Sequence, residues 1–364
     1  MCWSRLGRLN ALEEHRRSRF WKQGPGRGPG SADTLGRLHA RLTPHNLRQG
    51  LHYVSSRLQR NQALPRIGGL AVAVLDGHET HASYRRCCSG CLERTVPTEH
   101  GDDIQYYPRN LTLPLLSGSE LRLRLDLEPQ RPGEDEVATA LRLLDRVLTR
   151  YPRAFHLLLA GGLYARAPCV NLLLAHSKPA LIVLKDERRD LYPDACGLFA
   201  VTPPQPGRYR SRDCRGWDLP DLTPWPQVQA PMRVIRSQAI YSVRRQASDR
   251  VETFTREGVW ATTLPVAPAL TEQAVVLGRR RWDIENYGFN ELVNEGHSDP
   301  VYKHHPIAIE SFLLMAFLAY NLFPAFRLLH VKPEIRQGRT QRYWARLIAC
   351  ELCQEACFAE GSSP

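Results

Sequence analysis

The sequence predicts a mixed α/β protein: a mixed sheet flanked by helices, with a β-rich insertion and a small N-terminal helical module. Three observations predict this class. Short apolar runs alternate with segments of helical spacing between about residues 70 and 184. A block from 201 to 268 is first rich in Pro and then strand-like, and an acidic and an apolar helix follow it. Alternating strands and helices are typical of a sheet with helices on its faces.

Composition leaves the partner open. The chain has 364 residues and is 43% hydrophobic, enough for one large domain with additions or for two domains. Its formal net charge is +12, from 49 Lys and Arg against 37 Asp and Glu. Arg forks suit phosphate oxygens, which favours a polyanionic partner. A genome rich in G and C would also favour Arg, so composition alone does not decide.

The cysteine content and the apolar runs favour a soluble protein of a reducing cytoplasm. Ten cysteines in a chain of this length do not predict a disulfide scaffold. The basic stretch Met1–Arg27 lacks the apolar core of a signal peptide. The longest apolar run, Phe312–Phe323, falls short of the ~20 residues that a bilayer needs. We therefore expect a buried core helix there and no membrane partner.

The first region, residues 1–64, predicts a Gly/Pro linker at 22–31 followed by a helical module. Ser31 or Asp33 can cap a short helix that runs through His39. Thr43 and Pro44 have the residue types of an N-cap and a first helical position, so a second helix is expected to begin there.

The second region, residues 65–200, predicts the first part of the sheet and its helices. The alternation of Leu with Arg or Asp over Leu121–Leu127 indicates a half-exposed strand. Strands are also expected at Leu70–Leu75, Phe155–Ala160 and Ala180–Leu184, and helices at Glu134–Arg150 and Ala165–His176.

The block from 201 to 268 predicts a β-rich insertion. Seven prolines between Pro203 and Pro231 argue against regular structure over residues 201–232. Strands are expected afterwards at Val234–Val243 and Gly258–Leu264.

The last two regions are predicted to be helical. Residues 269–332 should contain a long helix, Thr271–Glu295, and the apolar helix from Pro306 to about Phe323. Residues 333–364 should contain a helix near 342–357 and a frayed tail.

Asp76 is the first residue that could carry chemistry. It ends the apolar run 70–75 and is followed by Gly77, which permits a tight turn. A carboxylate at a strand tip suits a metal ligand, because hard cations prefer oxygen. An ordinary turn Asp is the alternative.

The segment Arg281–Asn286 is the second candidate. On a helix, Arg281, Glu285 and Phe289 share one face. An exposed Arg–Glu pair is the alternative interpretation. The neighbouring Trp282 and Phe289 indicate instead that this face is partly buried, where a charged carboxylate is costly unless it has a partner or a role.

Cys87, Cys88 and Cys91 include a C-x-x-C, which could form half of a zinc site. A second half is not obvious, since His78 and His81 lie across an expected strand pair. A thiol cluster without metal is therefore the favoured interpretation.

Several motifs, taken in order, resemble DDE transposases of bacterial insertion sequences, and the resemblance runs from about residue 31 to 350. The segments Leu75–Glu79 and Ser83–Arg94 resemble the first-acid region, Ala160–Tyr164 the strand end with the second acid, Arg281–Asn286 the helix with the third, and Tyr302–Pro306 and Ala319–Phe323 the segment after it.

The resemblance implies a ribonuclease H-like core and two-metal phosphoryl transfer on DNA. Mg²⁺ or Mn²⁺ would activate a water or a 3′-hydroxyl and stabilise the leaving oxygen. The implied partners are insertion-sequence ends and target DNA, with a second copy of the chain, as a homodimer, a candidate. The implied location is the bacterial cytoplasm, on the nucleoid.

Carried over by position, the first catalytic, metal-binding acid is Asp76 and the third is Glu285. The second position holds Gly161, which has no side chain to coordinate a metal. Arg281 and Lys303 would approach DNA phosphate; a role for Arg281 in orienting the acid, and a solvated Lys303, are the alternatives.

No other acid fits the second position in this register, which Leu163–Tyr164 fixes. Asp145 falls inside a helix before the strand, and Asp186 and Asp190 come after the next strand. We therefore expect a DNA transposase with impaired strand cleavage and transfer. The alternatives are a non-catalytic DNA-binding relic of the same fold, or a ribonuclease H-like nuclease that hydrolyses without strand transfer.

Overall fold

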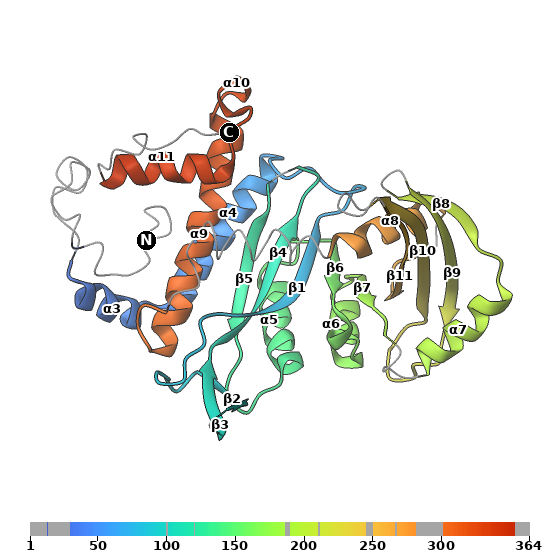
Figure 1. The fold of residues 1–364 in the computed structure, drawn as a ribbon, viewed down its shortest axis with the longest axis horizontal. Helices are drawn as coiled ribbons and strands as arrows, with labels where there is room; N and C mark the ends of the chain where they lie inside the picture. The colour runs from blue at the N-terminus through green and yellow to red at the C-terminus, as the bar shows by residue number, and fades with distance from the viewer. Residues whose placement is uncertain are drawn as a thin grey trace. The chain divides into compact units, whose positions relative to one another are not determined.

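The computed structural model (Figure 1) describes residues 13, 30–99, 101–119, 121–185, 190–209, 212–244, 250–265, 268–281 and 301–353. The chain divides into two compact units. Unit 1 comprises Met1–Pro65, Gly77–Thr139 and Glu285–Pro364, and unit 2 comprises Arg66–Asp76 and Ala140–Ile284. Helices occur together with parallel and antiparallel strands, so the mixed α/β class is confirmed.

Unit 2 is built on a mixed sheet with the strand order β1-β6-β7-β11-β10-β9-β8. The pairs β1–β6 and β6–β7 are parallel, and the following pairs are antiparallel. The strands are β1 (Val72–Glu79, which continues into unit 1), β6 (Leu157–Ala160), β7 (Ala180–Val183), β8 (Gln205–Tyr209), β9 (Arg212–Leu222), β10 (Met232–Arg244) and β11 (Val251–Thr262).

Helices accompany these strands. Helix α8 packs against β7, β10 and β11, and α7 packs against β9. The helices are α5 (Glu136–Arg150, whose first turn belongs to unit 1), α6 (Ala167–Ala175), α7 (Leu191–Val201) and α8 (Pro268–Arg280), with a short 3-10 helix η1 (Gly162–Tyr164) after β6.

The apolar runs at residues 70–75 and 155–160 form buried strands, as their composition predicts, but β1 continues through Asp76 and Gly77 to Glu79, so the strand tip and turn expected there were wrong. All of β6 and the segment Val72–Leu75 of β1 are buried. Strands covered on both faces are continuous apolar runs rather than alternating ones.

The expectation of irregular structure over 201–232 was wrong, because β8 and β9 lie within it. Pro206 is in β8, the edge strand, where a missing N–H does not break the ladder. Pro220 lies in a bulge of β9, where Pro220 and Asp221 together face Arg233 between the pairs Leu219–Val234 and Leu222–Met232. The sheet accommodates these prolines at an edge and at a bulge.

Unit 1 contains two hairpins and a helical layer. β2 (Leu92–Thr98) pairs with β3 (Gly101–Tyr107), and β4 (Arg109–Leu116) with β5 (Leu123–Pro129), both antiparallel. The helices are α3 (Ala32–Arg41), α4 (Pro44–Arg60), α9 (Pro306–His330), α10 (Pro333–Arg336) and α11 (Gln341–Cys353).

The predicted start of the helical module is confirmed. The Ser31 hydroxyl accepts from the Thr34 amide and caps α3, and Thr43 and Pro44 begin α4. The buried face of α4 packs on α9 and β5 in one apolar cluster: Leu51, Leu127, Leu313, Leu314, Phe317 and Tyr320.

The prediction of a half-exposed strand at 121–127 was wrong. Arg124 and Asp126 in β5 are 1% and 0% exposed, so both faces of the strand are buried. The Asn321 side chain of α9 bonds both backbone groups of Arg124, at 2.7 and 2.9 Å. Asp126 accepts from Arg48 of α4. Partners from distant segments therefore permit charged residues in the core.

Helix α9 is longer than the apolar run that predicted it. It extends over 25 residues and contains an 18-residue stretch of mean hydropathy 1.7, long and apolar enough to cross a bilayer. Half of that stretch is buried within the protein. Its packing on Leu51 and Leu127 is that of the expected core helix.

Two predicted helices are described in part. The first, expected to run to Glu295, begins at Pro268 and ends at Arg280, one residue before Arg281, the last described residue of that stretch; Glu285 lies outside the described residues. The second appears as α11 and is described as far as Cys353. The β2–β3 hairpin, β4 and α7 were not predicted.

Candidate functional site

The positions of the first and second acids follow the paired segments of two adjacent parallel strands, β1 and β6. In the β1–β6 register, Leu75 stands opposite Ala160. Asp76 and Gly161 are the next residues: β6 ends before Gly161, whereas β1 continues past Asp76 to Glu79. The Asp76 side chain is 20% exposed. The backbones at the two positions therefore lie beside one another in unit 2.

Gly161 has no conformational need to be glycine. Its backbone is extended, with φ −71° and ψ 165°. A Cβ added there would meet the Arg281 Nη1 atom at 4.0 Å, an ordinary contact distance. At the neighbouring Gly162, by contrast, a Cβ would lie 3.2 Å from the Val183 carbonyl oxygen. A side chain therefore fits at 161 but is crowded at 162.

Arg281 completes the described part of the site. Its Nη1 lies 3.6 Å from Asp76 Oδ2, and its side chain is 11% exposed. The distance is that of an ion pair rather than of a hydrogen bond. The guanidinium therefore lies beside Asp76 and beside the position that a side chain at 161 would take.

Helix α8 holds Arg281 in place. Gly278 allows the helix to lie on Trp260 of β11, since an added Cβ would approach the indole to 2.5 Å. Arg279 donates to the Ser237 hydroxyl of β10 at 3.1 Å. At the other end of α8, Gln273 donates to the Gly68 carbonyl, before β1, at 2.9 Å.

The other predicted residues lie elsewhere or outside the described chain. Lys303 belongs to unit 1, where its side chain is exposed and its stem lies along α3 at Gly36. Asp145 lies on an exposed face of α5, and Asp190 precedes α7. Glu285 and Asp186 are outside the described residues, so no distance from Asp76 to Glu285 tests the proposed convergence.

Of the residues proposed to hold divalent cations, the described part of the chain contains Asp76. One carboxylate, Asp76, is balanced by one guanidinium, Arg281, and Gly161 supplies no ligand. Across the ranges that the structure describes, no cluster of three His, Cys, Asp or Glu side chains could hold a metal. Mg²⁺ needs oxygen ligands and commonly uses one or two carboxylates.

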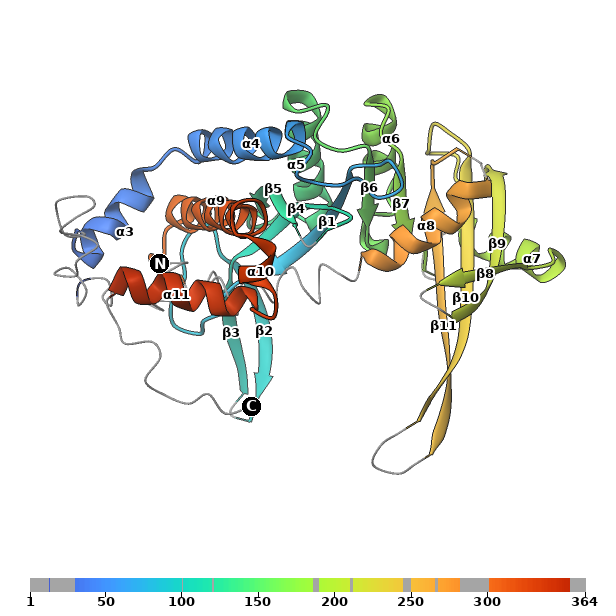
Figure 2. The same cartoon turned by 90° about the horizontal axis from the view of Figure 1, so that it is seen from above.

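Sequence reasoning missed an Arg-bearing ribbon in unit 2. Beyond Ala239, β10 pairs with β11 alone, from Ile240 opposite Thr255 to Arg244 opposite Val251. Figure 2 shows this hairpin extending past the neighbouring strands. Tyr241 stacks on Phe254 at 5.8 Å between ring centroids, and the Arg212 guanidinium lies 3.8 Å from the Tyr241 ring centroid. The strand at 234–243 was predicted, and the β-branched and aromatic residues of 251–255 were the signal available for its partner.

Comparison with solved structures finds weak similarity. A cryo-EM structure of the piggyBac transposase synaptic complex with hairpin DNA is similar over 95% of this chain and 76% of that chain. The sequence identity is 9% and the TM-score is 0.45, too low to assign a fold or a function. No family model matches the chain, and no curated protein matches it.

Proposed function

We propose that the protein is a DNA-binding transposase of an insertion sequence whose strand cleavage and transfer are impaired at position 161. The observation that supports this most directly is the placement of Asp76 and Gly161 directly after Leu75 and Ala160, the last paired residues of two adjacent parallel strands. The backbone at 161 accepts any residue, and the space beside it is open up to Arg281. Glycine there removes one carboxylate from the proposed catalytic set.

The proposed cofactor is Mg²⁺ or Mn²⁺, with Asp76 and Glu285 as the remaining ligands. When bound, the ions would activate the attacking oxygen and stabilise the leaving oxygen of a DNA phosphodiester. Because Arg281 already neutralises Asp76, we expect this chain to hold divalent ions weakly. An Asp at 161 would return a negative charge next to that guanidinium.

DNA is the proposed partner, as insertion-sequence ends and target DNA, with a homodimer as the proposed assembly. The formal charge of +12 supports a polyanionic ligand. The β10–β11 ribbon supports it further, because a two-stranded ribbon fits the major groove and Arg244 and Arg250 are exposed at its far end. Arg281 and Lys303 are proposed to contact phosphate.

DNA binding is tested by fluorescence anisotropy over a range of salt concentrations. Replacing Arg244 by Ala should weaken binding to duplexes of any sequence and reduce the slope of log K against log[salt] by about 0.9 for one lost phosphate contact. The matched control is Arg153→Ala, an exposed arginine outside the ribbon. Equal losses in both variants would remove the ribbon from the proposal.

Strand cleavage is tested on supercoiled plasmid with Mg²⁺ or Mn²⁺, comparing the wild type with Gly161→Asp. We expect little nicking by the wild type and a clear gain in Gly161→Asp that Asp76→Ala abolishes. Gly161→Asn, of similar size but uncharged, should not gain activity. Robust nicking by the wild type that depends on Asp76 would show that the second acid lies elsewhere. A joining assay with a pre-cut end separates transposase from nuclease activity.

A non-catalytic DNA-binding relic is the second candidate. The Arg281–Asp76 ion pair favours it, because a guanidinium beside the first acid competes with a cation for the same carboxylate. In that case Gly161→Asp binds DNA with unchanged affinity and nicks no plasmid.

A further inference from the structure

Cys88 and Cys91 of unit 1 form a close pair of thiols. Their Sγ atoms are 3.3 Å apart, and both cysteines are free. The Cys91 amide donates to the Cys88 carbonyl at 2.9 Å, which closes a tight turn, and the Cys88 amide donates to Cys91 Sγ at 3.2 Å. A disulfide bond is about 2.05 Å long, so a small movement within the turn would bring the sulfurs to bonding distance.

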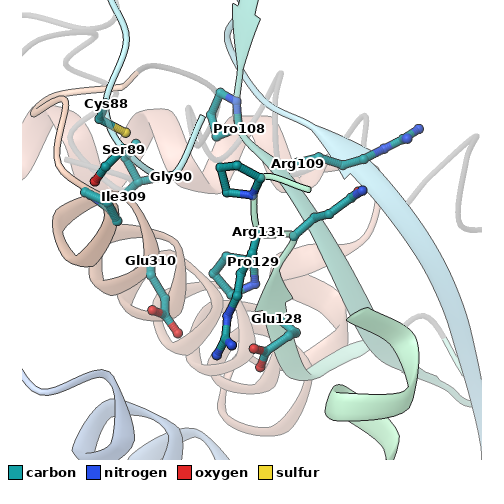
Figure 3. A pocket seen from close by; sticks show the side chains of 13 residues that line it. Cys88, Ser89, Gly90, Pro108, Arg109, Glu128, Pro129, Arg131, Ile309 and Glu310 are labelled. Atoms are coloured by element: carbon teal, nitrogen blue, oxygen red, sulfur yellow. The ribbon is translucent and has the colours of Figure 1, made fainter. Parts of the chain in front are cut away.

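The two thiols differ in access. Cys91 is 7% exposed, whereas Cys88 is partly exposed. Burial, followed by the hydrogen bond with Cys88, raises the pKa of the Cys91 thiol to about 11. Cys88 also lines a cavity of about 370 Å³, together with Ser89 and Gly90. Figure 3 shows these three residues beside Ile309, near the start of α9. A small molecule can therefore reach Cys88 more readily than Cys91.

Zinc binding accounts for this pair of thiols less well than disulfide formation does. Structural zinc takes four ligands, and a C-x-x-C supplies two. In the part of the chain that the structure describes, no third His, Cys, Asp or Glu joins them in a metal-holding cluster. His304 belongs to the same unit but forms no such cluster with the two cysteines. Burial, followed by the positive charge of Arg86, lowers the pKa of His304.

We propose that Cys88 and Cys91 are a redox-active dithiol that a small-molecule disulfide, such as oxidised glutathione, converts to an intramolecular disulfide. The Cys88 thiolate attacks one sulfur of the reagent, forms a mixed disulfide and releases one thiolate. Cys91 then loses its proton to solvent and attacks Cys88 Sγ, which releases the second thiolate. The protein loses two thiol protons and two electrons, and the reagent's disulfide is reduced to two thiols. This inference is independent of the proposed DNA chemistry.

The Cys88–Cys91 turn lies against the start of α9, so oxidation of the two thiols can affect that helix. A Cβ at Gly90 would lie 3.1 Å from side-chain atoms of Pro306, the first residue of that helix. Closing the Cys88–Cys91 bond moves a turn that contacts this helix start. We expect the amide hydrogen exchange of residues 306–310 to change on oxidation.

The test uses the full chain, reduced, freed of reductant and equilibrated in glutathione buffers of increasing oxidised fraction. Free thiols are alkylated and the protein is digested with trypsin, which cuts after Arg86 and Arg94 and so releases residues 87–94 with all three cysteines. We expect this peptide to lose two hydrogens, with Cys87 alkylated and Cys88 and Cys91 protected. The Cys214→Ser variant should give the same result.

Two variants separate the roles of the thiols. Cys91→Ser should accumulate glutathione on Cys88, because the second attack is removed. Cys88→Ser should leave Cys91 unmodified under the same conditions, and circular dichroism verifies that both variants fold. The proposal is overturned if Cys88 and Cys91 remain alkylatable where the partly exposed Cys214 reacts, if the bond joins Cys87 to Cys88, or if the purified protein carries stoichiometric zinc.

Discussion

The Arg281 guanidinium lies 3.6 Å from the Asp76 carboxylate, and a side chain added at Gly161 would begin 4.0 Å from the same nitrogen. The Arg281 guanidinium therefore faces both Asp76 and position 161. The effect of Arg281 on an acid introduced at 161 can be measured from protein stability, without an activity assay. Two nearby carboxylates repel one another unless a cation lies between them.

A double-mutant cycle tests this arrangement. Gly161→Asp alone should change the free energy of unfolding by less than about 1 kcal/mol, since Arg281 offsets its repulsion from Asp76. In the Arg281→Met background the same substitution should cost about 1–2 kcal/mol more. Urea denaturation of the four proteins gives the coupling, and Gly161→Asn repeats the cycle without the charge. Additive costs would show that Arg281 does not face position 161.

The neighbouring glycines should respond differently to the same small change. Gly161→Ala should be neutral or stabilise by about 0.4–1 kcal/mol, because its extended backbone suits alanine and the unfolded chain loses freedom. Gly162→Ala should destabilise by about 1–3 kcal/mol, because its Cβ would press on the Val183 carbonyl. Thermal unfolding of the two variants side by side measures the difference. Similar melting temperatures would contradict the described geometry.

Short sequence patterns predicted the helices and strands that depend on residues close together in the sequence. The apolar runs became β1 and β6, and Ser31 and Pro44 marked the starts of α3 and α4. The sequence placed both Asp76 and Gly161 at strand ends; Gly161 does follow β6, but β1 continues past Asp76 to Glu79.

Long-range partners account for the failures. Alternation in β5 predicted a solvent-facing row, but Asn321, 197 residues away from Arg124, supplies the hydrogen bonds that allow burial. No short window of sequence contains both residues. Pro206 favoured irregular structure in the sequence. The proline is tolerated in β8 because β8 is an edge strand, and a place at the edge is a property of the whole sheet. The Arg281–Asp76 pair likewise joins residues distant in sequence.

Arg48 is predicted to be the most sensitive charged residue of the helical module. It contacts Asp126 at 3.1 Å, Glu128 at 3.7 Å and also Glu310, and all four side chains are at most 17% exposed. Arg48→Met would leave three carboxylates facing one another without that cation, which should destabilise unit 1 by about 3–5 kcal/mol. Denaturant unfolding measures the loss.

The control for that loss lies on the same helix. Arg57 is exposed and rests on the Tyr53 ring at 5.2 Å, so Arg57→Met should change stability by at most about 0.5 kcal/mol. Equal effects of the two substitutions would mean that the cluster around Asp126 does not depend on Arg48.

His156 should make unit 2 less stable as the solution becomes acidic. Its Nδ1 accepts the Ala71 amide at 2.9 Å, at the start of β1, so the bond requires the neutral ring. Burial, followed by the charges of Arg66 and Lys178, lowers its pKa below 6.5. The unfolded chain therefore takes up the proton first: the stability is fully present above pH 6.5 and is lost as the pH falls through the folded-state pKa.

The measurement is the urea midpoint between about pH 7.5 and pH 5.5 for the wild type and His156→Gln. A Gln carbonyl can accept the same amide without titrating, so the variant should lose less stability over this interval. The comparison isolates His156 from His39 and His304, whose pKa values burial also lowers. Parallel pH profiles would show that the Ala71–His156 bond does not couple proton uptake to folding.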